Sequence, residues 1–341
     1  MHATVQYTRC NPARPGCLAR AFGVAVSALL PALAAVPALA QPSGPQLPKQ
    51  VQLVVPFAPG GSTDLFGRVL AQRLALRTGG TVLVENRPGA GGMVGAEYVS
   101  RAAPDGSVLM FTASDLSTGA ATRKTLPFDA EKGLAAVGMV ATGPMLLVVG
   151  GDSSYRSVEQ LLDAARQAKG SLNYGSAGIA SLHHLSGELL TALSKVEMAH
   201  VPYKGSAPAV QDLIAGRIQA MVASIPATIG HIKGGRLRAL AVTTPDRSRF
   251  LPELPTLAAT LPGYQVDIWW GVFAPGTAPQ ALLDRLNGEL RAVVGSPEMR
   301  ETFDREGAEP AAMNAAESNA FYRADIAKWR GIARQRSIVV E

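Results

Sequence analysis

The stretch PFAPGGSTD at residues 56–64 is the clearest local signal of the fold. The apolar, β-branched run 51–55 before it predicts a strand, and the apolar spacing over 65–74 after it predicts a helix. Gly60 and Gly61 allow a close backbone approach, and Ser62 is placed to cap the helix. Such a helix start directs free N–H groups and a helix dipole at one point, where an anion gains roughly 0.3–1 kcal/mol. A purely structural turn has the same spacing.

The alternation of strands and helices continues on both sides of this stretch. Strands at 81–84 and 108–112 flank a helix at 93–101, and the pattern starts again at 145–149. We therefore expect two similar α/β units, each with its own mostly parallel sheet and with clefts at the carboxyl ends of the strands. Further strands are predicted at 172–174, 198–201, 219–222, 237–242 and 268–273, and further helices at 157–169, 278–294 and 316–334 and from near Ser181, Ser206 and Pro226.

The second unit repeats the strand–glycine–helix arrangement. The segment NYGSAG at 173–178 follows a predicted strand and precedes Ser181 at the next helix start. Two such helix starts facing each other would hold a carboxylate or a diacid from both sides, and this two-sided grip couples binding to closure. The glycine cluster at 86–92 occupies a similar position in the first unit, where a packed surface turn explains it at least as well.

Residues 1–40 have the pattern of a secretory signal peptide. Three arginines and no acidic residue accompany an apolar stretch that ends in Ala38-Leu39-Ala40. A membrane anchor is the alternative, since the stretch is long enough to span a bilayer, but two prolines interrupt it. We expect cleavage after Ala40, export to the periplasm, and a flexible lead-in at 41–47.

Composition disfavours several classes of function. Both cysteines, Cys10 and Cys17, lie in the leader, so the mature chain has no disulfide, thiolate nucleophile or cysteine metal site. The net charge is +6, to which the leader contributes three arginines, and the other basic residues are too scattered for nucleic-acid binding. Hydrolase and zinc motifs are absent. The adjacent His183 and His184 would point about 100° apart on a helix, so we predict no catalytic residue, metal or cofactor.

Ten motifs in order make the chain similar to the Bug-type receptors of tripartite tricarboxylate transporters. The resemblance implies an α/β, type II periplasmic-binding-protein fold, in which two α/β lobes are joined by two crossing strands and enclose a ligand cleft. Lobe one would comprise 48–144 and 268–341, and lobe two 145–267. The motifs are VPFAPGGSTD, VENRPGAGG, AAPDG, LPFD, LNYGSAG, HL-x-GEL, VPYKGSAPA, LRALAVT, LPTLAATLPGY and GVFAPGTAP.

The resemblance also implies a function. The protein would capture a small solute, namely a carboxylate, an amino acid or a pyridine-type acid or amide, and deliver it unchanged to membrane permease subunits. We expect it to act as a monomer without a cofactor. The ligand-contacting residues implied by the family's loops and pocket walls are Phe57, Ala58, Gly60, Gly61, Ser62, Asp64, Thr112, Ser114, Ser176, Ser181, His184 and Ser224.

Two segments depart from the family's pattern. Residues 114–120 read SDLSTGA where many members resemble Ser-Gly-x-His-x-x-Asn, and 223–225 read ASI where an Asp or Asn is frequent. Both segments belong to predicted pocket walls, so they affect the ligand rather than the family. If Asp115 points inward, it would disfavour a ligand carboxylate at that end and favour an amino or amide group.

Two other functions compete with solute transport. A periplasmic enzyme on the same lobes would need a nucleophile–base pair or a metal, and the sequence contains neither arrangement. A sensor that presents its loaded form to a signalling partner would use the same closed state as a transport receptor, and neighbouring permease or kinase genes would distinguish these two roles.

Overall fold

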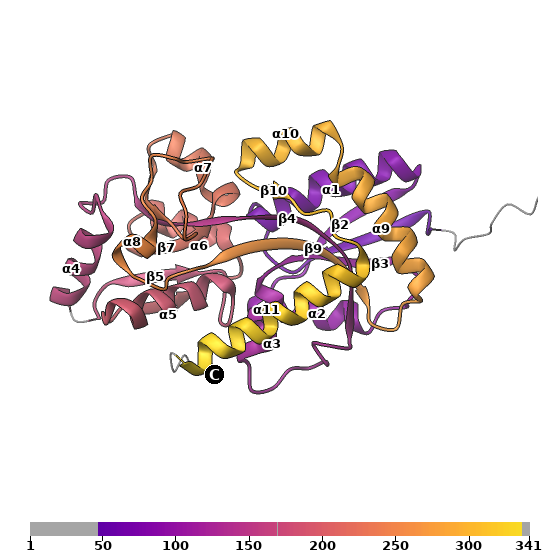
Figure 1. Ribbon diagram of the computed structural model, residues 1–341, viewed down its shortest axis with the longest axis horizontal. Helices are drawn as coiled ribbons and strands as arrows, with labels where there is room; N and C mark the ends of the chain where they lie inside the picture. The colour runs from indigo at the N-terminus through magenta and orange to yellow at the C-terminus, as the bar shows by residue number, and fades with distance from the viewer. Residues whose placement is uncertain (1–46, 169, 336–341) are drawn as a thin grey trace, which may run out of the picture. The chain divides into compact units, whose positions relative to one another are not determined.

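A computed structural model of the chain describes residues 47–168 and 170–335, so the predicted signal peptide and nearly all of the lead-in lie outside the described residues. The first elements alternate strand and helix, as the sequence predicts (Figure 1). Among the described residues, no helix combines the length and the apolar character that crossing a membrane requires. The first elements are β1 (Gln50–Val55), α1 (Ser62–Thr78), β2 (Thr81–Asn86), the 3₁₀ turn η1 (Ala90–Gly92), α2 (Met93–Ser100), β3 (Val108–Ala113) and α3 (Asp115–Thr122).

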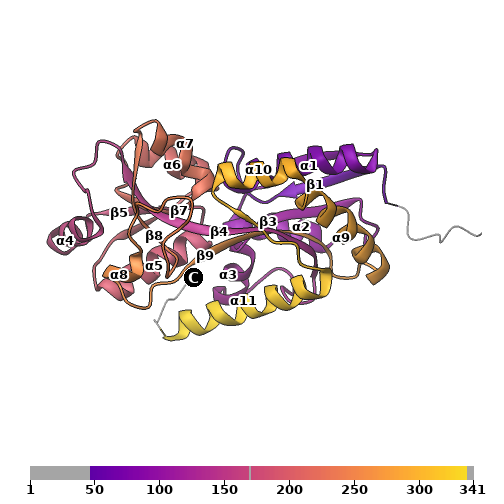
Figure 2. The same cartoon turned by 45° about the horizontal axis from the view of Figure 1, so that its top comes forward.

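The second half of β1 and nearly all of β3 are buried on both faces, which explains the apolar runs LVV and VLMF within them. Because side chains alternate along a strand, Leu53 and Phe111 pack into a core shared with α1, α9 and α10. Val54 and Met110 pack into another core shared with α2, α3 and α11. In Figure 2, α1 and α10 lie above these strands and α11 lies below them. The C-terminal helices are α9 (Gln280–Val294), α10 (Pro297–Glu306) and α11 (Ala315–Gln335).

Aromatic packing fixes the position of α1. The Phe66 ring lies 4.9 Å from the Trp270 ring in an edge-to-face arrangement and 5.6 Å from the Phe303 ring. All three rings are buried, and aromatic pairs of this geometry contribute about 0.5–1.5 kcal/mol beyond their burial. The start of α1, which lies within the PFAPGGSTD stretch, is therefore held by a rigid core.

The remaining elements repeat the alternation of strands and helices between two long strands. The first long strand is β4 (Leu134–Gly150) and the second is β9 (Asp267–Pro275), and both run across the middle of Figure 1. The elements between them are α4 (Val158–Ala168), β5 (Asn173–Ser176), α5 (Leu182–Ser194), β6 (Ala199–Pro202), α6 (Ser206–Ile214), β7 (Ala220–Ser224), α7 (Ile225–Lys233), β8 (Leu237–Val242) and α8 (Leu257–Thr260).

Strand β4 joins the two halves of the chain. Its first part pairs antiparallel with β9, from Leu134 opposite Pro275 to Pro144 opposite Asp267. Its second part pairs with β7 and β8, beginning with Met145 opposite Ser224. Each half has its own sheet, as expected, but the two sheets are not separate: both include β4, so the strands form one hydrogen-bonded path in the order β2-β1-β3-β9-β4-β7-β5-β6. The lobe boundaries stay a prediction, and we keep the names lobe one and lobe two for the predicted segments.

Three local expectations also need correction. Ser62 does not cap α1: the N-cap residue is Gly61, which provides no side-chain hydrogen bond, and Ser62 is the first helical residue. Residues 115–122 after the third strand form the helix α3, which the sequence did not indicate. The strand predicted at 145–149 is only the end of β4, which starts at Leu134.

Candidate ligand-binding site

The loop between β1 and α1 is held in place by the carboxylate of Asp64. The Gly60 N–H donates to Asp64 Oδ2 at 3.0 Å, and Arg68 Nε donates to the same oxygen at 2.9 Å. Asn86 Nδ2 donates both to Asp64 Oδ1 at 2.9 Å and to the Phe57 carbonyl at 3.0 Å. Gly60 has a φ of +90°, a conformation that favours glycine. Asp64 therefore fixes the shape of the loop.

The charge of Asp64 is balanced within lobe one. Burial by itself raises the pKa of this carboxyl group, but hydrogen bonds from Arg68, Gly60 and Asn86 outweigh it and hold the pKa below its ordinary value. Asp64 is thus an ionised carboxylate paired with Arg68, and the residue is 4% exposed. Its role in the loop is structural support for the backbone that follows Gly60.

The loop between β5 and α5 is likewise organised by its own side chains. Ser176 Oγ accepts the Gly178 N–H at 3.1 Å and lies 2.6 Å from His200 Nε2. Ser181 caps α5 by accepting the N–H of His184 at 3.2 Å, as its sequence position predicts. These two serines shape the loop from within.

His184 also faces the inside of this loop. Its Nδ1 accepts the Ala180 N–H at 3.2 Å, so the neutral ring carries its proton on Nε2, which lies 3.6 Å from Glu188 Oε1. The ring stacks on His200 with 3.8 Å between centroids. Burial lowers the pKa of His200 to about 4. His184 therefore belongs to a buried polar network behind the loop.

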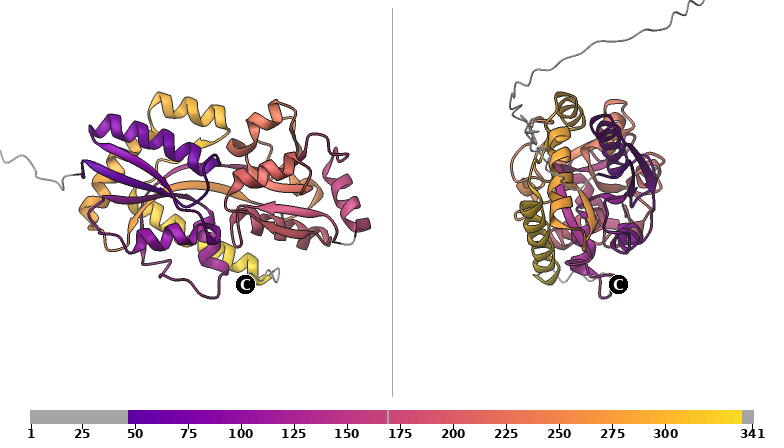
Figure 3. Two further views of the ribbon diagram at one scale, coloured as in Figure 1. Left: turned by 180° about the vertical axis from the view of Figure 1, so that it is seen from behind. Right: turned by 90° about the vertical axis from the view of Figure 1, so that its right-hand side faces the viewer.

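Direct contacts join the two predicted lobes. The backbone of lobe one at Gly91 lies against the backbone of lobe two at Ile179. A Cβ on Gly91 would lie 2.4 Å from the Ile179 carbonyl oxygen, and the φ of Gly91, +60°, also favours glycine. Figure 3 shows the indigo segments of lobe one next to the magenta and orange segments of lobe two at this boundary between the lobes. The hydrogen bonds across it include Ala58 N–H to Lys204 O at 2.9 Å, Thr118 Oγ1 to Ala180 O at 2.8 Å, Arg123 to Ile179 O at 2.7 Å, and Leu182 N–H to Asp115 Oδ1 at 3.1 Å.

A small polar cavity of about 10 Å³ lies between the lobes. This is about the room that one water molecule occupies, so the lobes are closed over the cavity. At one wall, a Cβ on Gly61 would lie 2.6 Å from Ser206 Oγ at the start of α6. The lining residues are Phe57, Gly61, Ser62, Thr63, Asp64, Asp115, Ala177, His183 and Ser206. A neighbouring hollow of about 290 Å³ lies along the glycine cluster and is lined by Phe57, 89–92, Arg123, 177–179 and 202–204.

The cavity brings together only part of the predicted site. Phe57, Gly61, Ser62 and Asp64 line it, whereas sequence reasoning missed Thr63, His183 and Ser206. Two of these carried a visible signal: Ser206 stands at a predicted helix start, and Thr63 belongs to the PFAPGGSTD stretch itself. His183 carried no such signal, since its direction depends on how lobe two packs against lobe one.

Other predicted residues support the strands around the cavity and do not line it. Thr112 is buried within β3 opposite Gly271. Ser114 Oγ accepts the backbone N–H of Trp269 at 2.8 Å. Ser224 ends β7 fully buried, and its hydroxyl has no hydrogen-bond partner among the described residues. The ligand roles of these residues stay predictions.

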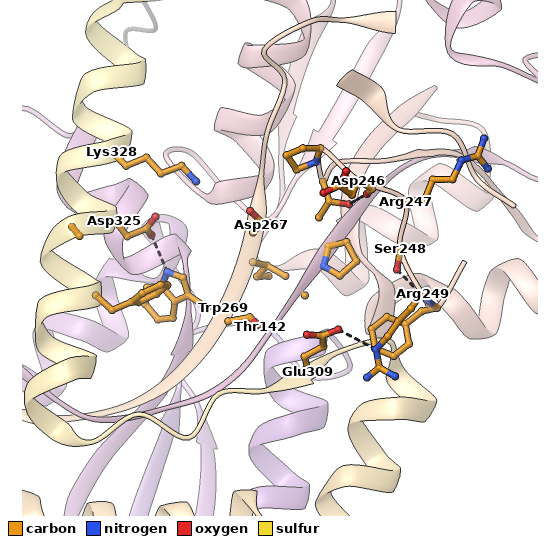
Figure 4. Close-up of a pocket in the computed structure, with 18 residues that line it drawn as sticks. Thr142, Asp246, Arg247, Ser248, Arg249, Asp267, Trp269, Glu309, Asp325 and Lys328 are labelled. Atoms are coloured by element: carbon orange, nitrogen blue, oxygen red, sulfur yellow. Dashed lines mark hydrogen bonds and ion pairs between the residues drawn. The ribbon is translucent and has the colours of Figure 1, made fainter. Parts of the chain in front are cut away.

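A larger cavity, of about 840 Å³, lies where β4 and β9 run beside α11 (Figure 4). Asp325 accepts the Trp269 indole N–H at 2.8 Å there, and burial raises the pKa of both Asp325 and Asp267. At the other end, Arg249 pairs with Glu309 at 3.0 Å. None of the predicted ligand residues lines this cavity, which therefore lies apart from the cavity at the helix starts.

Comparisons with known proteins identify the family. The model of the tripartite tricarboxylate transporter family receptor matches residues 66–338. A protein of Pseudomonas sp. (strain P51), described as a UPF0065 protein in the tcbD-tcbE intergenic region, is 39% identical over 261 residues, which are 76% of this chain and 78% of that protein.

Solved structures agree with this match. The periplasmic binding protein BugD has 31% identity and a TM-score of 0.81, over 85% of this chain and 98% of its own. An R. palustris protein with adipate has 35% identity and a TM-score of 0.82, over the same shares of 85% and 98%. The MatC protein from Rhodopseudomonas palustris with bound malate has 27% identity and a TM-score of 0.78, over 83% and 98%.

These structures confirm the α/β periplasmic-binding-protein fold that the sequence motifs implied. The family is one of solute-binding receptors, and the two related R. palustris proteins are solved with the carboxylates adipate and malate. The protein is accordingly a solute-binding receptor rather than an enzyme. The chain belongs to the tripartite tricarboxylate transporter receptor family.

Proposed function

We propose that this receptor works in the periplasm, where it binds one small carboxylate between its two predicted lobes and delivers it to the membrane permease subunits of its transporter. The family match supports the receptor role, and the export pattern of residues 1–40 supports the location. Adipate and malate in related structures support a carboxylate as the ligand class.

Two uncapped helix starts at one cavity carry this proposal. Helix α1 begins after Gly61 and α6 begins after Gly205, and neither N-cap residue provides a side-chain hydrogen bond. The first N–H groups of a helix have no intrahelical partner, so both helices present free donors and a positive dipole end. Gly61 and Ser206 line the same cavity. A carboxylate bound there would satisfy donors from both lobes.

Binding and release then require the lobes to separate. The cavity of about 10 Å³ admits no organic acid while the lobes are in contact. The lobes are connected through β4 and through the segment that leads into β9, so bending within β4 near Pro144 would separate the two helix starts and open the cavity. A ligand that contacts both helix starts favours the closed state because only that state presents both sets of donors.

A ligand screen tests the proposal. Small mono-, di- and tricarboxylates, including adipate and malate, amino acids and pyridine amides are compared by thermal shift, and the hits are measured by calorimetry. A ligand at 100 times its Kd adds ~2.7 kcal/mol of stability, which a thermal shift detects readily. Neutral diamides of the same chain length serve as controls for the charge. If no acid stabilises the exported protein, the carboxylate assignment is wrong.

A further inference from the structure

The carboxylate of Asp115 lies between the two predicted lobes. Asp115 is the first residue of α3 in lobe one, and its Oδ1 accepts the N–H of Leu182, the first residue of α5 in lobe two, at 3.1 Å. It is 2% exposed and lines the cavity at the helix starts. A carboxylate of the protein itself thus occupies the α5 helix start, so α5 is not free to bind a ligand carboxylate in this closed state.

The carboxylate of Asp115 has no permanently charged cation beside it among the described residues. No lysine or arginine pairs with it there, and its nearest basic group is His183 Nδ1, 3.6 Å from Oδ1 and beyond hydrogen-bond distance. This differs from Asp64, which has Arg68 at 2.9 Å. A buried carboxylate without a cation is costly, so this position favours a ligand that brings a positive charge.

His183 gives a second indication of a ligand. It is 3% exposed and lines the same cavity, yet neither of its ring nitrogens has a hydrogen-bond partner within residues 47–168 and 170–335. Buried polar groups in proteins are nearly always paired, and an unpaired one calls for an explanation. Its neighbours around the cavity, Ser62, Thr63 and Ser206, are hydroxyl residues from the two uncapped helix starts.

We propose that Asp115 and His183 bind an ammonium group of the ligand, so that this receptor selects an amino acid over the plain dicarboxylate of the same length. This inference rests on the proposed function, because the ligand carboxylate is placed at the uncapped starts of α1 and α6. The ammonium then neutralises Asp115 and donates to the free His183 nitrogen. A plain dicarboxylate instead brings a second negative charge toward an acid that already has one, in a cavity with little water to screen it.

Matched pairs of acids test the inference by calorimetry on the exported protein. Aspartate is compared with succinate, glutamate with glutarate and 2-aminoadipate with adipate, because the members of each pair differ only in the amino group. In at least one pair the amino acid should bind tenfold or more tightly than its partner. Asp115→Asn keeps the acceptor for the Leu182 N–H and removes the charge, so it should reduce that ratio at least tenfold. His183→Gln should reduce it in the same direction.

Two controls separate specificity from folding. Asp163→Asn removes an exposed carboxylate on α4, far from the cavity, and should leave the ratio unchanged. Thermal unfolding without ligand shows whether the variants are folded. The inference is overturned if each plain acid binds the parent as tightly as its amino partner, if Asp115→Asn leaves the ratio unchanged, or if no amino acid of the three binds. Dicarboxylates that bind parent and Asp115→Asn alike would leave the carboxylate receptor in place while removing this inference.

Discussion

Gly61 offers a way to perturb lobe closure with little effect on the fold of either lobe. Its backbone has a φ of −84° and a ψ of 174°, which every L-residue adopts. A Cβ there would lie 2.6 Å from Ser206 Oγ, and the next nearest atom, the Ala207 nitrogen, is 3.8 Å away. Because Ser206 belongs to lobe two, an added methyl group collides only in the closed state. Gly61→Ala should therefore weaken ligand binding and leave the unliganded protein folded.

The expected magnitude follows from the identity of the colliding atom. Extra methyl groups in a well-packed site typically cost about 1–3 kcal/mol. Ser206 Oγ ends a short side chain that can rotate, so Gly61→Ala should lie near the lower limit, at ~1 kcal/mol or roughly a fivefold rise in Kd. Rotation of Ser206 does not make room for the two additional methyl groups of Gly61→Val. That variant should therefore reach the upper limit, at ~3 kcal/mol or roughly a 150-fold rise in Kd.

The assay is calorimetry with the tightest acid from the ligand screen, on a double-mutant cycle. Ser206→Ala in the Gly61→Ala protein removes Oγ and leaves Ser206 Cβ at 3.9 Å, so it should restore most of the lost affinity. Gly60→Ala is the matched control. The φ of Gly60, +90°, strains any side chain by ~1–2 kcal/mol in the open and in the closed state alike. The added Cβ itself has room, since it would lie 3.6 Å from the Ala207 Cβ. That variant should lose thermal stability and little affinity. If Gly61→Ala binds like the parent, or Ser206→Ala restores nothing, the two helix starts do not meet in the bound state.

Two electrostatic perturbations complete the set. Arg68→Met leaves Asp64 without its cation and should lower the free energy of unfolding at pH 7 by about 1–2 kcal/mol. This loss is smaller than that for breaking a fully buried ion pair, because the Arg68 side chain is 52% exposed. Since the native pKa of Asp64 is lowered, this difference should shrink as pH falls below about 4, and equal urea midpoints at pH 7 would contradict the role of Arg68. The pKa of His200 is lowered from 6.5 to about 4, so the unfolded chain binds a proton between these values that the folded protein does not, and stability should fall as pH decreases through this window. Because the ring is partly exposed, we expect this loss of unfolding free energy to be about 1–2 kcal/mol. His200→Gln should flatten the dependence of unfolding free energy on pH, measured by urea titration. An unchanged dependence would mean that other groups cause it.

Local sequence signals predicted the elements that build the site. The PFAPGGSTD stretch does join a strand to a helix, and Ser181 does cap the helix that follows NYGSAG. Both predictions depend on neighbouring residues only, namely apolar periodicity, glycines that relax the backbone, and a hydroxyl at a helix start. The Ser62 cap failed because Gly61 and Ser62 both suit an N-cap position, and spacing alone does not choose between them.

The missed elements depend on distant residues. The first part of β4 contains glycines and ends in Pro144, which resembles a linker. It is a strand because β9 pairs with it and α9 packs closely: a Cβ on Gly138 would lie 2.8 Å from Leu290, and Asn287 donates to the Val137 carbonyl at 2.8 Å. Helix α3 is similar, since its Gly119 has poor helix propensity but allows Met93 to approach within 2.7 Å of where a Cβ would be.

The same distinction explains why the sequence indicates the class of ligand better than the ligand itself. A carboxylate site made from backbone N–H groups needs only a turn that exposes them, and glycines and a helix start specify that turn locally. The identity of the solute depends on the few side chains that reach the cavity from other elements, such as Asp115 on α3 and His183 on α5. Their direction is set by the packing of one lobe against the other. Receptors with the same loop should therefore differ in ligand mainly at these two positions, and exchanging residues there should change selectivity more than any substitution that preserves the glycine turn.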